Sequence, residues 1–113
     1  MIHSFVFGEG KLVERDMDLS TIPMLLKDAG VHVWIDLQNP TQEESKHVLG
    51  SIFQFHPLAI DDCIAPSQLP KVEEYDDYLF IVIHAVDFDR KDEHFRTTEL
   101  NMFLGKNYLH ITI

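Results

Sequence analysis

The longest apolar run of the chain is the feature that most constrains its fold. It covers residues 78–86, YLFIVIHAV, and is broken only by His84. Successive side chains of a β-strand point to opposite faces of a sheet, and here both faces are apolar. A strand of this kind is covered on both sides, so we expect it near the centre of a sheet. His84 alternates with Phe80, Val82 and Val86, which predicts a histidine packed in the core.

Four strand patterns follow one another in the last third of the chain. A short polar turn separates each from the next, and the first of these turns is Asp76-Asp77. Strands that are joined by such short turns pair in antiparallel fashion. The predicted strands are residues 71–75, 78–87, 95–104 and 108–113.

The first third of the chain predicts a hairpin, a short helix and one more strand. Apolar residues alternate through residues 31–37, and Trp34 adds apolar surface to the second face, so we expect an interior strand there. The other predicted elements are a hairpin of residues 2–7 and 11–15 around Gly8-Glu9-Gly10, and a helix that Ser20 or Thr21 caps and Gly30 ends.

Two further helices are predicted in the middle of the chain. Thr41 and Glu44 fit the capping box that opens a helix. Pro57 suits the first position of the next helix, and Pro66 is expected to end it. On a helical wheel this second helix carries Ala59, Ile60, Cys63 and Ile64 on its apolar face, and Asp61 and Asp62 point to the other side.

These elements predict a single α/β (α+β) domain over residues 1–113. Its core is a mixed, largely antiparallel sheet of about seven strands with helices packed on it. The late strands require antiparallel pairing, whereas the strand-helix-strand passages allow parallel pairing.

The charge of the chain restricts its partners. The formal net charge is −10, and ten of the nineteen carboxylates lie between Asp61 and Glu93. This balance argues against binding to nucleic acid or to an anionic membrane surface, both of which require basic residues. It favours divalent cations or a basic protein partner. Composition alone also fits a solvated acidic face that keeps the domain soluble.

Cys63 is the single cysteine, so no internal disulfide can form, and a reducing compartment is indicated. Its place on an apolar helix face predicts a buried, inert thiol. The N-terminus lacks the pattern of a signal peptide, and no apolar run approaches the about 18–20 residues of a membrane helix. We therefore expect this chain to be soluble in water.

No catalytic motif is present. The sequence contains no G-x-S-x-G, Walker, H-E-x-x-H or C-x-x-C pattern, and no two of its seven histidines are three or four residues apart. His56, before Pro57, is interpreted as a structural residue that caps or braces the turn. An enzyme is therefore not expected.

Adjacent carboxylates are the remaining candidates for chemistry. They form the pairs Asp61-Asp62, Glu73-Glu74 and Asp76-Asp77. Neighbouring side chains on a helix diverge by about 100°, so Asp61 and Asp62 cannot close a cation site alone. They can offer oxygen ligands to Mg²⁺ or Ca²⁺ when another element supplies the rest. The alternative is a solvated surface.

Taken in order, several segments resemble the N-terminal cytoplasmic domain of the CorA family of divalent-cation transporters. Each segment is weak singly, but the ordered set is specific. The segments are Val33-Trp34-Ile35-Asp36-Leu37 with Pro40-Thr41-x-Glu43-Glu44, His56-Pro57-Leu58-x-x-Asp61-Asp62, Gln68-x-Pro70-Lys71-Val72-Glu73, Tyr75 to Val82 and Glu99 to Leu104.

The resemblance implies a regulatory, Mg²⁺-sensing domain of a pentameric channel for Mg²⁺, or for Co²⁺ or Ni²⁺. It implies a place in the funnel on the cytoplasmic side of the cell (inner) membrane. The stalk and membrane helices that would contact the membrane are expected beyond Ile113 and are absent from this chain.

The resemblance also assigns a metal site. In the family an acidic pair helps to bind regulatory Mg²⁺ between neighbouring subunits, which implies Asp61 and Asp62 here, with Asp62 the stronger candidate. Binding to the isolated domain is expected to be weak or absent. Two departures bear on the ion and its affinity: Asp61 stands where the family often has Glu, and Leu69 stands where it often has Arg.

Two alternatives remain open at the level of sequence. One is a zinc-transporting relative of the same family, in which the histidines would matter more. The other is a free-standing acidic protein-interaction module without a metal role. The gene's continuation beyond Ile113 distinguishes this module from a transporter.

Overall fold

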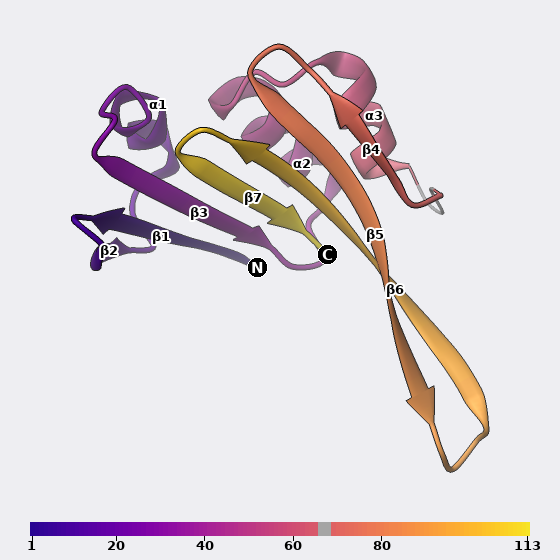
Figure 1. The fold of residues 1–113 in the computed structure, drawn as a ribbon. Coiled ribbons are helices and arrows are strands. Elements are labelled where there is room, and N and C mark those ends of the chain that lie inside the picture. Colours follow the sequence, from indigo (N-terminus) through magenta and orange to yellow (C-terminus); the bar gives the residue numbers. More distant parts are fainter. Residues whose placement is uncertain (66–68) are drawn as a thin grey trace.

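A mixed β-sheet forms the body of the molecule (Figure 1). The computed structural model describes residues 1–65 and 69–113, and in this part of the chain seven strands lie in the order β2-β1-β3-β7-β6-β5-β4. Among them β3 and β7 pair in parallel, and all other neighbours are antiparallel. The predicted fold class is therefore confirmed. The strands are β1 (Ile2–Gly8), β2 (Lys11–Arg15), β3 (Val31–Leu37), β4 (Lys71–Glu74), β5 (Tyr78–Asp89), β6 (His94–Gly105) and β7 (Tyr108–Thr112).

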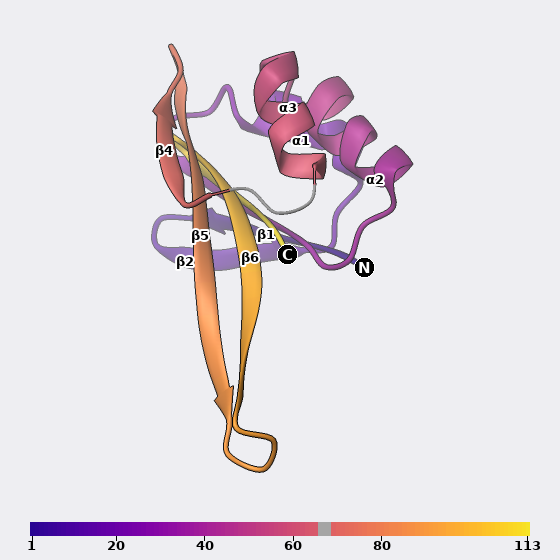
Figure 2. The ribbon, with the colours of Figure 1, turned by 90° about the vertical axis from the view of Figure 1, so that its right-hand side faces the viewer.

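The described helices lie on one side of the sheet (Figure 2). Their apolar faces enclose two buried clusters, one centred on Phe80 and Phe103 and the other on Ile35 and Leu37. None of these helices is both long enough and apolar enough to cross a lipid bilayer. The helical segments are η1 (Leu19–Thr21), α1 (Ile22–Leu25), α2 (Gln42–Lys46), the π-helical turn η2 (His47–Ile52) and α3 (Pro57–Ile64).

The capping box of α2 is confirmed. The Thr41 hydroxyl accepts a hydrogen bond from the Glu44 backbone N–H at 3.1 Å, and the Glu44 carboxylate accepts one from the Thr41 N–H at 3.0 Å. Two N–H groups that the first turn of a helix leaves without partners are thereby satisfied.

The predicted start of the first helix is confirmed in position, and its predicted end is wrong. Thr21 occupies the N-cap position of α1 without a capping hydrogen bond from its side chain, and Asp18 caps the preceding turn η1, where its carboxylate accepts from the Ser20 N–H at 3.0 Å. The helix ends at Leu25 instead of near Gly30, since the Asp28 carboxylate accepts from the Gly30 N–H at 2.9 Å and holds a turn there. Side chains of this kind compete with helical hydrogen bonding.

The two longest strands form an arm that extends beyond the rest of the sheet (Figures 1 and 2). Strand β4 begins opposite Val82 and β7 ends opposite Asn101, so the arm beyond these residues has no neighbouring strand among those described. The prediction of a central strand covered on both faces is therefore wrong. Strand β5 is second from the edge of the sheet, and the face that carries Phe80 and Val82 is buried, whereas Leu79 and Ile81 on the other face are partly exposed. His84, predicted to lie in the core, is exposed because it falls just past Val82.

The buried histidine of this fold is His110. Its side chain lies among Phe53, Phe55 and Phe103, with ring centroids between 5.7 and 6.4 Å away. Its Nε2 is 2.8 Å from the Thr112 hydroxyl, whereas Nδ1 has no hydrogen-bond partner in the described residues. Burial lowers the pKa of His110 from 6.5 to about 3, so the imidazole is neutral in the folded protein.

This burial predicts a loss of stability in mild acid. The unfolded chain binds a proton at His110 near pH 6.5 and the folded chain only near pH 3, so the stability present above pH 6.5 is lost as the pH falls through this interval. We expect the free energy of unfolding to fall by about 2 kcal/mol between neutral pH and pH 5 through this residue.

Urea denaturation at several pH values measures this effect. A His110→Gln variant, which cannot be protonated in this range, is expected to lose that part of the pH dependence. Parallel curves for the two proteins would contradict the assignment.

Candidate cation site

Helix α3 carries the predicted metal ligands and is fixed at its start by His56. The His56 Nδ1 atom accepts a hydrogen bond from the Leu58 N–H at 3.1 Å, and Pro57 occupies the first helical position. This confirms the structural role predicted for His56. The expected end of the helix at Pro66 lies outside the described residues, and the last helical residue is Ile64.

The two faces of α3 are divided as predicted. Ala59 and Cys63 are buried against the sheet, whereas Asp61 is exposed and Asp62 is partly exposed on the other side. Leu58 lies on that same outer side and is 64% exposed. Burial raises the pKa of the Cys63 thiol to about 11, so the thiol is neutral at physiological pH, as expected of an inert cysteine.

An ion pair attaches this outer side of α3 to the edge strand β4. The Lys71 Nζ atom is 2.6 Å from the Asp62 carboxylate and also contacts the Glu73 carboxylate. Lys71 and Glu73 are alternate residues of the strand and therefore share a face. The hydrogen bonds with Asp62, and then with Glu73, raise the pKa of Lys71, so its ammonium group stays charged.

Aromatic side chains extend this contact back to the start of α3. The Tyr75 hydroxyl donates to Glu73 at 3.1 Å, and the Tyr75 ring stacks on Tyr78 with centroids 5.0 Å apart. The Tyr78 hydroxyl in turn accepts from the His56 N–H at 2.8 Å. Both ends of α3 are therefore held to the hairpin of β4 and β5.

The structure places the two predicted ligands in different surroundings. Asp62 is turned toward Lys71, whereas no hydrogen bond or ion pair joins the Asp61 carboxylate to another described residue. Within residues 1–65 and 69–113, no group of three or more His, Cys, Asp or Glu side chains is arranged to hold a metal ion. The assignment of a metal to Asp61 and Asp62 therefore stays a prediction, and a site there needs oxygen ligands from elsewhere.

Lys71 is the site residue that the sequence reasoning missed. A Lys-x-Glu pattern at the start of a strand places both charges on one face, which was a usable signal. The partner on α3 could not be read in the same way, because it depends on how the helix packs against the strand.

Comparison with known proteins gives this geometry a context. The model of the family described as CorA-like Mg²⁺ transporter protein matches residues 29–113. The chain belongs to this family. Two relatives of the CorA-like chain are the Bacillus subtilis protein YfjQ, whose name describes a metal ion transporter, and the cobalt/magnesium transport protein CorA of Thermotoga maritima.

These relatives are much longer than the CorA-like chain. YfjQ is 40% identical over 76 residues, which cover 67% of this chain and 22% of YfjQ. The Thermotoga protein is 27% identical over 81 residues, which cover 72% of this chain and 23% of that protein. The chain thus spans less than a quarter of either relative.

A solved structure supports the fold of this CorA-like chain. The soluble domain of CorA from Methanocaldococcus jannaschii matches with a TM-score of 0.67 at 19% identity, over 99% of this chain and 40% of that chain. At this identity the likeness concerns the fold.

The ion pair of Asp62 with Lys71 predicts a difference in stability between two matched variants. Asp62→Asn removes the carboxylate that Lys71 binds and is expected to lower the free energy of unfolding by about 1 kcal/mol. Asp61→Asn makes the same change of charge one residue away and is expected to have an effect below about 0.5 kcal/mol. Urea denaturation in the presence of a chelator compares them, and equal losses for both variants would speak against a specific pair.

Proposed function

We propose that this chain is the Mg²⁺-sensing regulatory domain of a CorA-like transporter of divalent cations, on the cytoplasmic side of the cell (inner) membrane. Membership of the CorA-like Mg²⁺ transporter family supports the transport role, and a relative named for cobalt and magnesium transport supports the class of ion. Family membership also favours this role over that of an enzyme or a free-standing interaction module.

The observation that carries the sensing role is the ammonium group held by Asp62. The distance of 2.6 Å between Lys71 Nζ and the Asp62 carboxylate identifies a point at which α3 already stabilises a positive charge. Mg²⁺ prefers carboxylate oxygens and keeps several of its waters, so one or two carboxylates of a chain suffice as direct ligands. Asp62 fits such an ion at this point, and the exposed Asp61 adds negative charge beside it.

Lys71 competes with Mg²⁺ for the carboxylate of Asp62. While the ammonium group of Lys71 neutralises Asp62, a divalent cation must displace this group or share the carboxylate with it. A single copy then binds Mg²⁺ weakly, because the gain from the ion is reduced by the loss of the ion pair. Carboxylates of a neighbouring copy would supply the missing ligands, which gives Mg²⁺ a direct effect on the association of subunits.

This arrangement would act as a two-state switch in a pentamer. With Mg²⁺ bound, α3 and the neighbouring copy are joined through the ion. Without it, the acidic surfaces repel each other, and each Asp62 returns to its own Lys71. The cation influences the equilibrium only through its tighter binding to the joined state.

Two variants with opposite effects test the proposal in the full-length protein that contains this chain. Asp62→Ala removes the ligand and is expected to abolish the Mg²⁺ dependence of protection from protease. Lys71→Met keeps the apolar stem but removes the competing charge, and is expected to lower the Mg²⁺ midpoint by about fivefold, equivalent to about 1 kcal/mol.

Asp76→Asn, in the turn between β4 and β5, is the control for a general change in charge and should leave the midpoint unchanged. An unchanged midpoint in Asp62→Ala would show that the sensor is elsewhere. A higher midpoint in Lys71→Met would show that Lys71 supports the ion rather than competes with it. Repeating the titration with Zn²⁺ and Co²⁺ compares the midpoints of protection for the three ions.

A further inference from the structure

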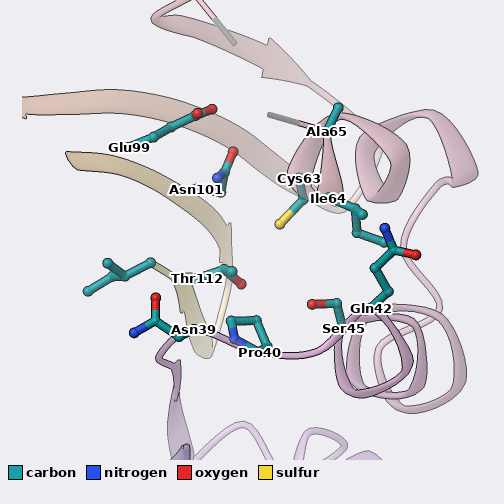
Figure 3. Close-up of a pocket in the computed structure, with 11 residues that line it drawn as sticks. Asn39, Pro40, Gln42, Ser45, Cys63, Ile64, Ala65, Glu99, Asn101 and Thr112 are labelled. Atoms are coloured by element: carbon teal, nitrogen blue, oxygen red, sulfur yellow. The ribbon is translucent and has the colours of Figure 1, made fainter. Parts of the chain in front are cut away.

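A second polar site lies on the other side of α3, away from Asp61 and Asp62. A cavity of about 290 Å³ separates the C-terminal end of α3 from α2 and from strands β6 and β7 (Figure 3). It has room for roughly ten water-sized volumes. Its polar lining includes Ser45 of α2, Cys63 of α3, Glu99 and Asn101 of β6 and Thr112 of β7.

Asn101 has an unsatisfied hydrogen-bond acceptor in this cavity. The residue is only 6% exposed, and its Oδ1 atom has no hydrogen-bond partner in the described part of the chain. Asn101 lies opposite Thr112 in the pairing of β6 with β7, so both side chains project from the same face of the sheet toward Cys63 (Figure 3). The Thr112 hydroxyl is within hydrogen-bond distance of His110 Nε2, at 2.8 Å. A buried carbonyl oxygen without a donor destabilises the fold unless a water molecule or another bound group supplies that donor.

The charge and chemistry of the lining indicate what that group is. The described lining residues include the carboxylate of Glu99 and the amides of Asn39 and Gln42, and none of them is Lys, Arg or His. Such a lining disfavours an anion, and the buried amide oxygen disfavours a purely apolar molecule. The Cys63 thiol is neutral at physiological pH, so it offers no thiolate to a soft metal ion.

We propose that this cavity binds a small organic cation with N–H donors, an alkylammonium or guanidinium group, whose N–H donates to Asn101 Oδ1. Two sources share this chemistry: a free molecule such as a diamine, and a Lys or Arg side chain from another polypeptide segment. The site is independent of the proposed Mg²⁺ sensor, because its residues lie on the opposite side of α3.

NMR titration of the isotope-labelled chain tests the proposal with methylguanidinium as the probe. We expect saturable shifts of the Asn101 side-chain amide and of the Thr112 and Cys63 backbone amides. Tetramethylammonium carries the same charge without an N–H donor and should leave these signals in place. Putrescine and N-acetylarginine amide are titrated in separate experiments. Tighter binding of putrescine indicates a free diamine as the ligand, whereas tighter binding of N-acetylarginine amide indicates a side chain of another polypeptide segment.

Asn101→Leu is the decisive variant, since it removes the side-chain oxygen that lacks a hydrogen-bond donor and keeps a side chain of similar volume. It should fold with an equal or higher Tm and bind methylguanidinium at least about tenfold more weakly. Asp61→Asn, on the other side of α3, should bind as the unaltered chain does.

Thermal melts with and without methylguanidinium give a second readout. Methylguanidinium should raise the Tm of the unaltered chain but not that of Asn101→Leu. Equal binding by Asn101→Leu, equal shifts with tetramethylammonium, or the absence of saturable shifts would each overturn the proposal.

Discussion

The ammonium group of Lys71 links helix α3 to strand β4, the next described element of the chain. It contacts Asp62 of α3 and Glu73 of β4, and the ring of Tyr75 continues the contact toward the start of the helix. Because Ala59 and Cys63 are buried on the opposite side of α3, the helix cannot rotate without losing either core packing or this ion pair. The position of both carboxylates on the outer surface follows from these two constraints.

The same constraints separate two kinds of chemistry on one short helix. The outer side of α3 presents Asp61 and Asp62, where a positive charge is stabilised at the surface. The inner side presents Cys63 to a cavity in which the acceptor of Asn101 is buried. Charge is screened by solvent on the outer side, whereas the acceptor of Asn101 on the inner side is buried, where a polar group without a partner is costly. The two proposals therefore concern different ligands and can be tested separately.

Local patterns predicted the elements well because their causes are local. Alternation gave the limits of β3, and the side chains of Thr41 and Glu44 gave the start of α2. The errors came from contacts that depend on distant parts of the chain. His84 is exposed because β4 and β7 stop short of it, and alternation within β5 carries no information on the lengths of neighbouring strands. The partner of Asp62 was missed for the same reason, since helix packing selects it.

Mg²⁺ and Lys71 compete for Asp62 in the proposed sensor, and the ammonium group of Lys71 reports on this competition directly. The measurement is the side-chain ¹⁵N signal of Lys71 in the isotope-labelled chain as Mg²⁺ is added. We expect this signal to move toward that of an exposed lysine over the same Mg²⁺ range in which the backbone amides of Asp61 and Asp62 shift. A Lys71 signal that stays in place while those amides shift would contradict the proposed competition.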